Sequence, residues 1–422
     1  MDRLDTDARQ DFRPHEHAME APARSPRPSM SGRLVRSVLT RLGDPRIEFE
    51  LWTGERIRTS LEPPLGRLII RDVRTLREIC MRGEVGMGDA YADGGLEVDG
   101  DLASILEDVY LHSPRRADDT GRPAAATRRS RRAHRNTLVG SRDNIHHHYD
   151  IGNAFYSLWL GETMSYTCAY YPTPDATLDA AQVAKMDHVC RKLRLQPSEH
   201  VLEAGFGWGT LATHMASRYG VRVRAYNISE EQVRFARERA AGLGLGRQVE
   251  YVHDDYRNAT GPCDAFVSVG MLEHVGTENY ATLGHVISRC LKPNGRGLVH
   301  SIGRNQPEPL HPWIERRIFP GAYPPSLKEM MDIFEPWNLS VLDVENLRLH
   351  YARTCRHWLE AFEAARDRVA AMFDERFVRM WRLYLAGSTA AFRTGELQLF
   401  QVVFAPGRSN DVPWTRADLY AR

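Results

Sequence analysis

The chain has 422 residues, of which 42% are hydrophobic and 26% charged, and its formal net charge is +1. This composition is typical of a folded protein with a sizeable core, and the charge provides no global field that would draw a nucleic acid. Six scattered cysteines with no C-x-x-C pair exclude a zinc ribbon or disulfide framework and favour a reducing cytoplasm. Residues 1–10 are polar and no run of about 18 apolar residues occurs, so neither a secretory signal nor a spanning helix is predicted.

Residues 1–32 are rich in Pro, Arg and Ser and carry little apolar surface. Burial there cannot offset the entropy of ordering, so we expect a disordered tail. A small folded domain is predicted over 33–113, where an alternating stretch at 47–52 and an apolar run at 68–70 favour strands. Helical spacing at 102–111 predicts a helix. Four glycines between these segments favour turns: Gly86, Gly88, Gly94 and Gly95.

Residues 114–142 form a basic linker with nine arginines and only two acids. The segment suits a solvated connection between two domains. The functional alternative is attraction to anionic phospholipid head groups, at up to about 1 kcal/mol per Arg near a membrane surface. Nucleic acid would attract the same charge, but no aromatic residues are interleaved for base stacking, so we expect no nucleic-acid partner.

From residue 143 to residue 422 the pattern predicts one α/β domain. Strand-like and helix-like segments alternate, which favours a mainly parallel sheet covered by helices on both faces. The predicted strands are 200–204, 221–227, 249–253, 265–269 and 297–302, and the predicted helices are 210–219, 230–243 and 280–291. A last apolar segment, 397–404, is expected to close the sheet as a late edge strand.

The most informative segment is 200–210, where a predicted strand runs into Gly205, Gly207 and Gly209 before a helix. Glycine lets the backbone approach a ligand closely, and the helix N-terminus supplies free N–H groups. The spacing differs from the dinucleotide G-x-G-x-x-G pattern. With Glu203 at the strand end, the loop resembles that of S-adenosylmethionine (SAM)-dependent methyltransferases, whose cofactor has a cationic amino-acid end. A packing turn beside a solvated Glu203 is the structural alternative.

Two further strand ends carry polar groups. Asn227 and Ser229 follow the second predicted strand, and residues 254–256 follow the third. In open α/β sheets, ligands gather at the carboxyl ends of the strands, so these groups are candidates to contact ribose and adenine. Each could instead serve as an ordinary turn or helix cap.

Six motifs occur in an order and spacing that match one known family. They are Gly86-Met87-Gly88-Asp89-Ala90-Tyr91, His148-Tyr149-Asp150-Ile151-Gly152-Asn153, Ser165-Tyr166-Thr167-Cys168-Ala169-Tyr170, Gly205-Phe206-Gly207-Trp208-Gly209, Ser268-Val269-Gly270-Met271-Leu272-Glu273-His274-Val275-Gly276 and Ile318-Phe319-Pro320-Gly321. With these motifs, residues 71–405 resemble the cyclopropane-fatty-acyl-phospholipid synthases, which are related to the mycolic acid cyclopropane synthases.

The resemblance implies a Rossmann-like SAM-dependent methyltransferase fold behind a smaller N-terminal domain that recognises lipid or forms a homodimer. It implies transfer of a one-carbon unit from SAM to the cis double bond of an unsaturated phospholipid acyl chain. A carbocation then loses a proton to bound bicarbonate and closes a cyclopropane ring. This chemistry needs a dry apolar pocket, aromatic faces and a positioned base. The aromatic candidates are Tyr166, Tyr170, Tyr171 and Tyr351.

Carried over by motif, the residues that would hold bicarbonate are Cys168, Glu273, His300, the backbone of Ile302, and Tyr351. His300 and Tyr351 can donate hydrogen bonds, Glu273 can accept one, and Cys168 would be a packing or weak-donor residue. Taken alone, Cys168 also fits a buried small hydrophobe, and His300 fits a satisfied core histidine. The residues that would contact SAM are Tyr166, Gly205, Gly207, Asn227, Gln232, Asp254, Asp255 and Tyr256.

Two positions depart from the family pattern: Phe206 replaces the cysteine of a Gly-Cys-Gly turn, and Asn227 replaces the threonine after the second strand. SAM binding is still expected, but the prediction of substrate and product is weakened.

The histidine triplet 146–148 predicts no metal site, because adjacent side chains point in different directions and no carboxylate set completes it. The resulting hypothesis is a cytoplasmic enzyme that associates peripherally with the inner face of the membrane.

Three other hypotheses stay open. The cation could be captured differently, which would give a methyl- or methylene-branched acyl chain. A small-molecule methyltransferase is a second alternative, although it would not need the N-terminal domain or the bicarbonate set. A non-catalytic SAM- or lipid-binding protein would show an eroded site, and the presence of Glu273, His300 and Tyr351 argues against it.

Overall fold

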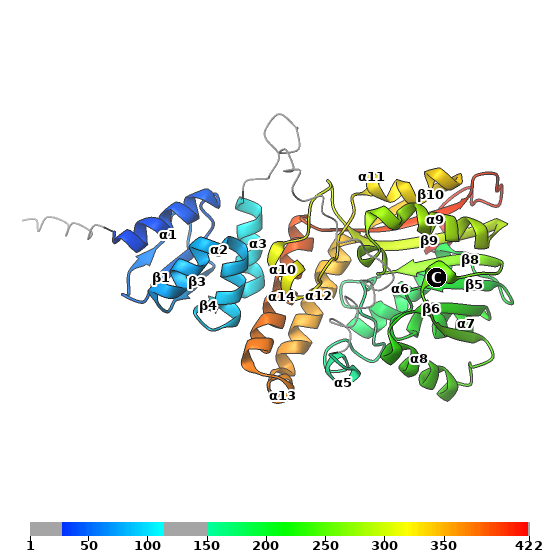
Figure 1. Ribbon diagram of the computed structural model, residues 1–422, viewed down its shortest axis with the longest axis horizontal. Coiled ribbons are helices and arrows are strands. Elements are labelled where there is room, and N and C mark those ends of the chain that lie inside the picture. The colour runs from blue at the N-terminus through cyan, green and yellow to red at the C-terminus, as the bar shows by residue number, and fades with distance from the viewer. Residues whose placement is uncertain (1–27, 114–150, 421–422) are drawn as a thin grey trace, which may run out of the picture.

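The computed structural model describes residues 28–113 and 151–420. The basic linker 114–142, the histidine triplet 146–148 and most of the predicted tail lie outside these ranges. Figure 1 shows a small N-terminal unit on one side and a large sheet on the other, with the long helices α12 (Arg348–Ala364) and α14 (Glu375–Thr394) standing between them.

The N-terminal unit is a four-stranded sheet with helices packed on it. Its elements are α1 (Met30–Arg41), β1 (Ile47–Leu51), β2 (Arg56–Ile57), β3 (Gly66–Ile70), α2 (Val73–Ala92), β4 (Leu96–Gly100) and α3 (Leu102–His112). The strand order is β2-β1-β3-β4, with β1 and β3 parallel and the other pairs antiparallel. The predicted strands at 47–52 and 68–70 and the helix at 102–111 are confirmed. Helix α1 begins at Met30, inside the range predicted for the tail.

The predicted turns at Gly86 and Gly88 are wrong, because both residues lie inside helix α2. This helix has its kink at Gly83, where φ is 54° and ψ is −130°. Gly88 serves packing instead: a Cβ there would approach the indole of Trp313 to 2.4 Å. The missing side chain therefore lets helix α10 (Pro312–Arg317) lie directly against the N-terminal unit.

The second sheet has seven strands in the order β10-β11-β9-β8-β5-β6-β7. Its strands are β5 (His200–Ala204), β6 (Arg222–Asn227), β7 (Val249–His253), β8 (Cys263–Val269), β9 (Leu291–Gly303), β10 (Leu339–Asn346) and β11 (Gln398–Pro406). The pairs among β5 to β9 are parallel. This sheet confirms the predicted α/β, Rossmann-like fold class, in which ligands bind at the carboxyl ends of the parallel strands.

Helices cover both faces of the large sheet. One face carries α6 (Leu178–Lys192), α7 (Thr210–Tyr219) and α8 (Glu230–Gly242), and the other carries α9 (Tyr280–Cys290). The remaining short helices are α5 (Asn153–Tyr156), α11 (Leu327–Met330), α13 (Arg366–Met372) and α15 (Ala417–Tyr420).

The segment 397–404 was expected to be an edge strand, and that position is wrong. Strand β11 is antiparallel to both β9 and β10, so it lies inside the sheet, and β10 forms the edge. Every residue of β11 from Gln398 to Ala405 is buried. Strand β10 was not predicted, because its sequence lacks a continuous apolar run or a clear alternation.

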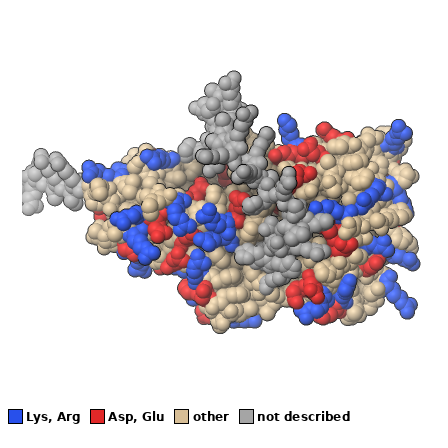
Figure 2. All heavy atoms as spheres, viewed as in Figure 1, with Lys and Arg blue, Asp and Glu red and all other residues tan. Residues whose placement is uncertain are grey.

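Helix α14 connects the two units, since it packs against α2 and α3 on one side and against α12 on the other. One hydrophobic cluster accordingly runs from the inner face of the small sheet through α14 to α12. No helix within the described ranges is long and apolar enough to span a bilayer. On the face seen in Figure 2, basic and acidic side chains are interspersed.

Candidate active site

The glycine loop after β5 is shaped by backbone conformations that side chains disfavour. Gly205, Gly207 and Gly209 all have positive φ, at 81°, 55° and 80°. A Cβ on Gly205 would meet Met271 Cβ at 2.9 Å, and a Cβ on Gly209 would meet the Tyr251 hydroxyl at 2.5 Å. The loop can therefore approach a ligand and start helix α7 directly afterwards, as the sequence predicted.

Glu203 lies under this loop as a buried carboxyl group. It is 2% exposed, and its Oε2 has no hydrogen-bond partner among the described residues. Burial raises the pKa of Glu203 to about 8, although nearby Lys185 opposes the shift. Burial also lowers the pKa of Lys185 to about 8. An unpaired buried carboxyl is costly unless a cation arrives, so this residue fits the ammonium end of SAM.

Asn227 and Gln232 form a polar pair at the carboxyl end of β6. Asn227 Nδ2 donates to Gln232 Oε1 over 2.8 Å, and Asn227 Oδ1 accepts from the backbone N–H of Ser229 over 3.0 Å. Gln232 is buried, and its Nε2 lacks a partner within the described part of the chain. The departure to asparagine thus keeps the strand end polar and leaves one buried donor for a ligand hydroxyl.

Asp254, Asp255 and Tyr256 form the turn after β7, and two of them have structural partners. Asp255 binds the guanidinium of Arg257 through Nε and Nη2, both at 2.8 Å. Asp254 Oδ1 accepts from the backbone N–H of Asp255 at 2.7 Å and from Asn258 Nδ2 at 2.9 Å. Tyr256 is 9% exposed. Asp254 and Asp255 therefore both brace the turn at the carboxyl end of β7.

A cavity of about 840 Å³ lies between the N-terminal unit and helices α12 and α14. Its lining is predominantly apolar and includes the inner face of the small sheet, for example Phe49 and Leu68. Four of the predicted site residues line it: Tyr166, Glu273, Ile302 and Tyr351. The resemblance implied an apolar pocket, and folding forms it partly from the N-terminal unit, which no sequence pattern indicated.

Glu273 is the most distinctive group in this cavity. The short 3₁₀ helix Leu272–His274, just after β8, carries it, and the side chain is 7% exposed. Its Oε1 accepts from the backbone N–H of Ile302 over 2.5 Å, and its Oε2 has no partner in the described structure. Burial raises the pKa of Glu273 to about 7, even though the hydrogen bond from Ile302 favours the charged form. A carboxyl group that titrates near neutrality can act as a general base or hold one.

Cys168 and His300 are buried outside the cavity lining. Burial raises the pKa of the Cys168 thiol well above its usual value, and Sγ lies 3.2 Å from the carbonyl of Ala169. The thiol is therefore a packing group and not a nucleophile. His300 is 2% exposed, and its Nδ1 lies 3.0 Å from Gln401 Nε2. Glu273 and Ile302 line the cavity together with Tyr166 and Tyr351. Cys168 and His300 are not part of that lining.

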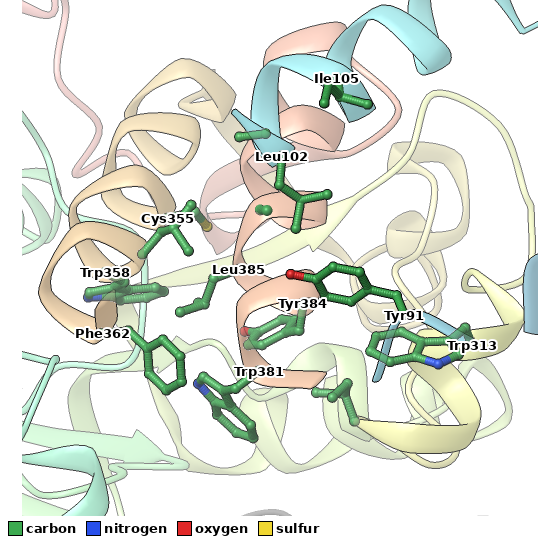
Figure 3. Close-up of a cluster of buried hydrophobic side chains, with 14 of the residues drawn as sticks. Tyr91, Leu102, Ile105, Trp313, Cys355, Trp358, Phe362, Trp381, Tyr384 and Leu385 are labelled. Carbon is green, nitrogen blue, oxygen red and sulfur yellow. The ribbon is translucent and has the colours of Figure 1, made fainter. Parts of the chain in front are cut away.

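Tyr166 packs among other aromatic rings, and its hydroxyl oxygen lies 2.8 Å from that of Tyr384. Tyr351 stacks on Phe392 with ring centroids 4.4 Å apart. Figure 3 shows Trp381, Tyr384 and Leu385 projecting from α14, with Trp358 and Phe362 on α12 facing them. Sequence reasoning missed Tyr384 and Phe392, although apolar and aromatic residues recur at helical spacing along α14.

Tyr170 and Tyr171 do not line the cavity. Tyr170 stacks between the rings of His188 and His350, at 4.3 Å and 4.8 Å. The guanidinium of Arg353 lies 4.3 Å from the Tyr171 ring. Within residues 28–113 and 151–420, no group of three or more His, Cys, Asp and Glu side chains is placed to hold a metal ion.

The family model described as mycolic acid cyclopropane synthetase matches residues 137–402. A probable fatty acid methyltransferase of Pseudomonas putida is 35% identical over 89% of this chain and 96% of its own length. The cyclopropane-fatty-acyl-phospholipid synthase of Escherichia coli is 37% identical over 79% of this chain and 86% of its own. A tuberculostearic acid methyltransferase of Mycobacterium tuberculosis is 36% identical over 77% of this chain and 79% of its own.

Solved structures agree with these matches. The cyclopropane synthase MmaA2 from Mycobacterium tuberculosis superimposes with a TM-score of 0.60 at 28% identity, over 63% of this chain and 98% of that one. The mycolic acid cyclopropane synthase CmaA1, solved with SAH and CTAB, gives 0.59 at 30% identity, over 62% and 97%. The family match, the relatives and the shared sheet together show that this chain belongs to the mycolic acid cyclopropane synthetase family and is a SAM-dependent methyltransferase.

Proposed function

We propose that the enzyme transfers a one-carbon unit from SAM to the cis double bond of an unsaturated phospholipid acyl chain and forms a cyclopropane fatty acid. The observation that carries the proposal is the apolar cavity whose lining includes Glu273. A cavity of about 840 Å³ with predominantly apolar walls suits a long hydrocarbon and exceeds the needs of a small polar substrate. The N-terminal unit contributes one wall, so it takes part in lipid recognition.

Glu203, the glycine loop and Gln232 are the groups that would hold SAM, through a buried carboxyl, close backbone approach and a buried amide donor. SAM, when bound, supplies an electrophilic methyl group on a sulfonium. The protein's part is to exclude water and to present aromatic faces to the cationic acyl chain, and Tyr166 and Tyr351 line the cavity for this purpose.

Loss of a proton from the cationic chain requires a base at this end of the cavity. Glu273 either takes the proton itself or orients a bicarbonate that does, with Tyr351, His300 and the backbone of Ile302 as the other groups that would hold the anion. The unpaired Oε2 of Glu273 supports this arrangement, since it can accept a hydrogen bond from the bicarbonate hydroxyl. In this arrangement Cys168 packs beside the site.

The proposal extends to a cytoplasmic enzyme that binds the anionic inner face of the membrane peripherally. Helix α1 supports this idea, because Met30 and Leu34 are 81% and 44% exposed beside exposed Arg33 and Arg36. Apolar side chains can enter the head-group boundary while arginines pair with anionic lipid. The basic linker 114–142 would add to the attraction, and the homodimer stays a prediction.

A methyl- or methylene-branched product is the second candidate function. The relatives named as fatty acid methyltransferases, at 35% and 36% identity, favour it specifically. The two outcomes share the cavity, the cofactor and the cationic chain, and they differ in which proton leaves. A small-molecule methyltransferase leaves the apolar cavity without a role, and a non-catalytic SAM- or lipid-binding protein leaves the buried Glu273 without one.

Incubation with methyl-labelled SAM and vesicles of cis-monounsaturated phospholipids tests the function. We expect each labelled lipid to gain one CH2, to lose its alkene and to show a cyclopropane signal by NMR. The same mass gain with an alkene retained would move the assignment to a branched product. Absence of label in lipid, with SAM binding intact, would contradict an acyl substrate.

A substitution that fills the cavity should separate lipid recognition from cofactor binding. Gly387 of α14 lines the cavity, and a Cβ built on it would have Leu106 Cδ1 as its nearest neighbour, at 4.0 Å. Gly387→Leu should lower lipid turnover at least about 10-fold, the rate equivalent of 1.4 kcal/mol, and leave SAM affinity unchanged. The same change at the exposed Gly242, at the end of α8, is the matched control and should affect neither quantity.

Glu203→Gln should stabilise the SAM-free protein at high pH and weaken SAM binding. Burial raises the pKa of Glu203 from 4.5 to about 8, so the folded state retains a proton that the unfolded state has lost. The free energy of unfolding therefore falls as pH rises through this window. The fall exceeds about 1 kcal/mol, because each unit of pKa difference between the folded and unfolded states is worth about 1.4 kcal/mol. Thermal unfolding of both proteins at pH 5 and pH 9 checks this, and an equal pH response would contradict the assignment.

A further inference from the structure

A row of polar side chains crosses three strands of the large sheet, buried at His300 and Gln401 and partly exposed at Glu345. His300 on β9 lies directly opposite Gln401 on β11, which lies opposite Glu345 on β10. Side chains that face each other across strands share one face of the sheet. Helix α6 covers this face and adds Lys192, whose Nζ lies 2.7 Å from Gln401 Oε1 and 2.6 Å from Glu345 Oε2.

The row fixes the direction of every hydrogen bond in it. Burial lowers the pKa of Lys192, but the Glu345 carboxylate 2.6 Å away opposes that shift. As the ammonium partner of Glu345, Lys192 donates to that carboxylate and to Gln401 Oε1. Burial opposes ionisation of Glu345, but His188 and Lys192 outweigh it and lower the pKa of Glu345 to about 2. The Gln401 atom beside Lys192 is therefore the amide oxygen, and the amide nitrogen faces His300.

The amide nitrogen Nε2 of Gln401 can only donate hydrogen bonds, and it lies 3.0 Å from His300 Nδ1. Nδ1 must accept, which places the ring proton of a neutral His300 on Nε2. Burial, with Lys185 and Lys192 nearby, lowers the pKa of His300 well below its usual value and keeps the ring neutral. None of the described residues hydrogen-bonds Nε2, so this N–H is available as a donor.

His300 and Ile302 project from the same face of β9, because side chains alternate along a strand. Ile302 lines the cavity, and its backbone N–H donates to Glu273. His300 therefore lies on the same face of β9 as Ile302, two residues before the backbone N–H that Glu273 accepts. We propose that Lys192 and Gln401 are positioning residues that hold His300 as the Nε2–H tautomer, so that it donates to an anion bound at Glu273.

The inference deepens the proposed function and rests on it for the anion. The opposite tautomer would present a lone pair from Nε2 to that anion and would replace a donor by a repulsive contact. Inverting the tautomer of a catalytic imidazole costs up to about 10⁴-fold in rate where the imidazole holds its partner directly. Glu345 and Lys192 act at a distance, through the amide of Gln401.

Nitrogen-15 NMR of the ring-labelled, full-length protein measures the tautomer directly, and a His300→Gln variant identifies the resonance. We expect wild-type His300 to show a pyrrole-like Nε2 and a pyridine-like Nδ1. A wild-type His300 that is cationic or protonated at Nδ1 would overturn the proposal. This arm needs no turnover, so it stands apart from the lipid assay, whose failure would contradict the proposed function and not the tautomer.

Gln401→Glu is the sharpest variant, because a carboxylate of nearly the same shape can only accept from Nδ1. His300 should switch to the Nδ1–H tautomer, and kcat should fall about 10²-fold or more with KM for lipid unchanged. Gln398→Glu is the matched control: Gln398 is equally buried on β11, but it bonds Gly395 and Asn346 instead of His300. That control should keep the wild-type tautomer.

A switched tautomer in Gln401→Glu with wild-type kcat would overturn the role of the pair. If Gln401→Glu does not fold, Lys192→Met removes the charge that orients the amide, and it should yield a mixture of both tautomers. A single Nε2–H population in Lys192→Met would likewise count against the proposal.

Discussion

Glu273→Gln should abolish most of the lipid modification while leaving the fold intact. Loss of a positioned acid–base group costs about 10²- to 10⁴-fold in rate. Glutamine keeps an oxygen that can accept from the Ile302 backbone N–H, which the carboxylate now does over 2.5 Å. It cannot accept a proton or titrate near neutrality, which burial allows Glu273 to do by raising its pKa to about 7. Single-turnover assays with labelled SAM measure the loss.

The stability of this variant separates chemistry from misfolding. Because the folded-state pKa of Glu273 lies above its usual 4.5, the wild-type protein loses stability as pH rises from 4.5 to about 7. Glu273→Gln should therefore unfold at the same or a higher temperature at pH 8. Glu315→Gln, on the exposed side of α10, is the matched control and should change neither rate nor stability. A wild-type rate in Glu273→Gln would remove this residue from the mechanism.

Asp89→Ala should loosen the N-terminal unit from the catalytic domain and lower lipid turnover with it. Asp89 is 4% exposed on α2 and accepts from Trp313 Nε1 at 3.2 Å and from Arg317 at 3.0 Å and 2.8 Å. Arg82 adds a contact at 2.6 Å. Truncating one partner of a buried charged network costs about 2–5 kcal/mol. We expect the lower part of this range, because the two arginines are about one third exposed and can return to water.

Limited proteolysis and thermal unfolding measure this loosening, and the lipid assay reports its consequence for the cavity. Burial opposes ionisation of Asp89, but Arg317 and Arg82 outweigh it and lower its pKa. The stabilisation should therefore disappear as pH falls through that lowered pKa. Asp93→Ala is the matched control, since Asp93 pairs with Arg376 across the same boundary while both side chains stay about half exposed. That pair should contribute at most about 1 kcal/mol. Equal effects of the two substitutions would contradict a central role for Asp89.

The local elements and the glycine loop could be predicted from the sequence alone. Strand β5, the three glycines and helix α7 were readable because hydrophobic periodicity and turn chemistry are local properties of the chain. The motifs also identified Glu273, and the structure shows it buried with an unpaired oxygen. Gly86 and Gly88 were misread as turns, because glycine in sequence does not reveal whether a helix needs a close neighbour such as Trp313.

The contacts between distant segments become visible only in the folded structure. Strand β11 lies inside the sheet, where Gln401 is opposite His300 and contacts its ring. Lys192 in turn donates to the Gln401 amide oxygen. Folding also closes a cavity between residues near Phe49 and residues near Phe392, more than 300 positions apart in the chain. Strand order and packing between units depend on contacts whose sequence separation leaves no periodic trace, so they follow from the burial of the whole chain and not from any single segment.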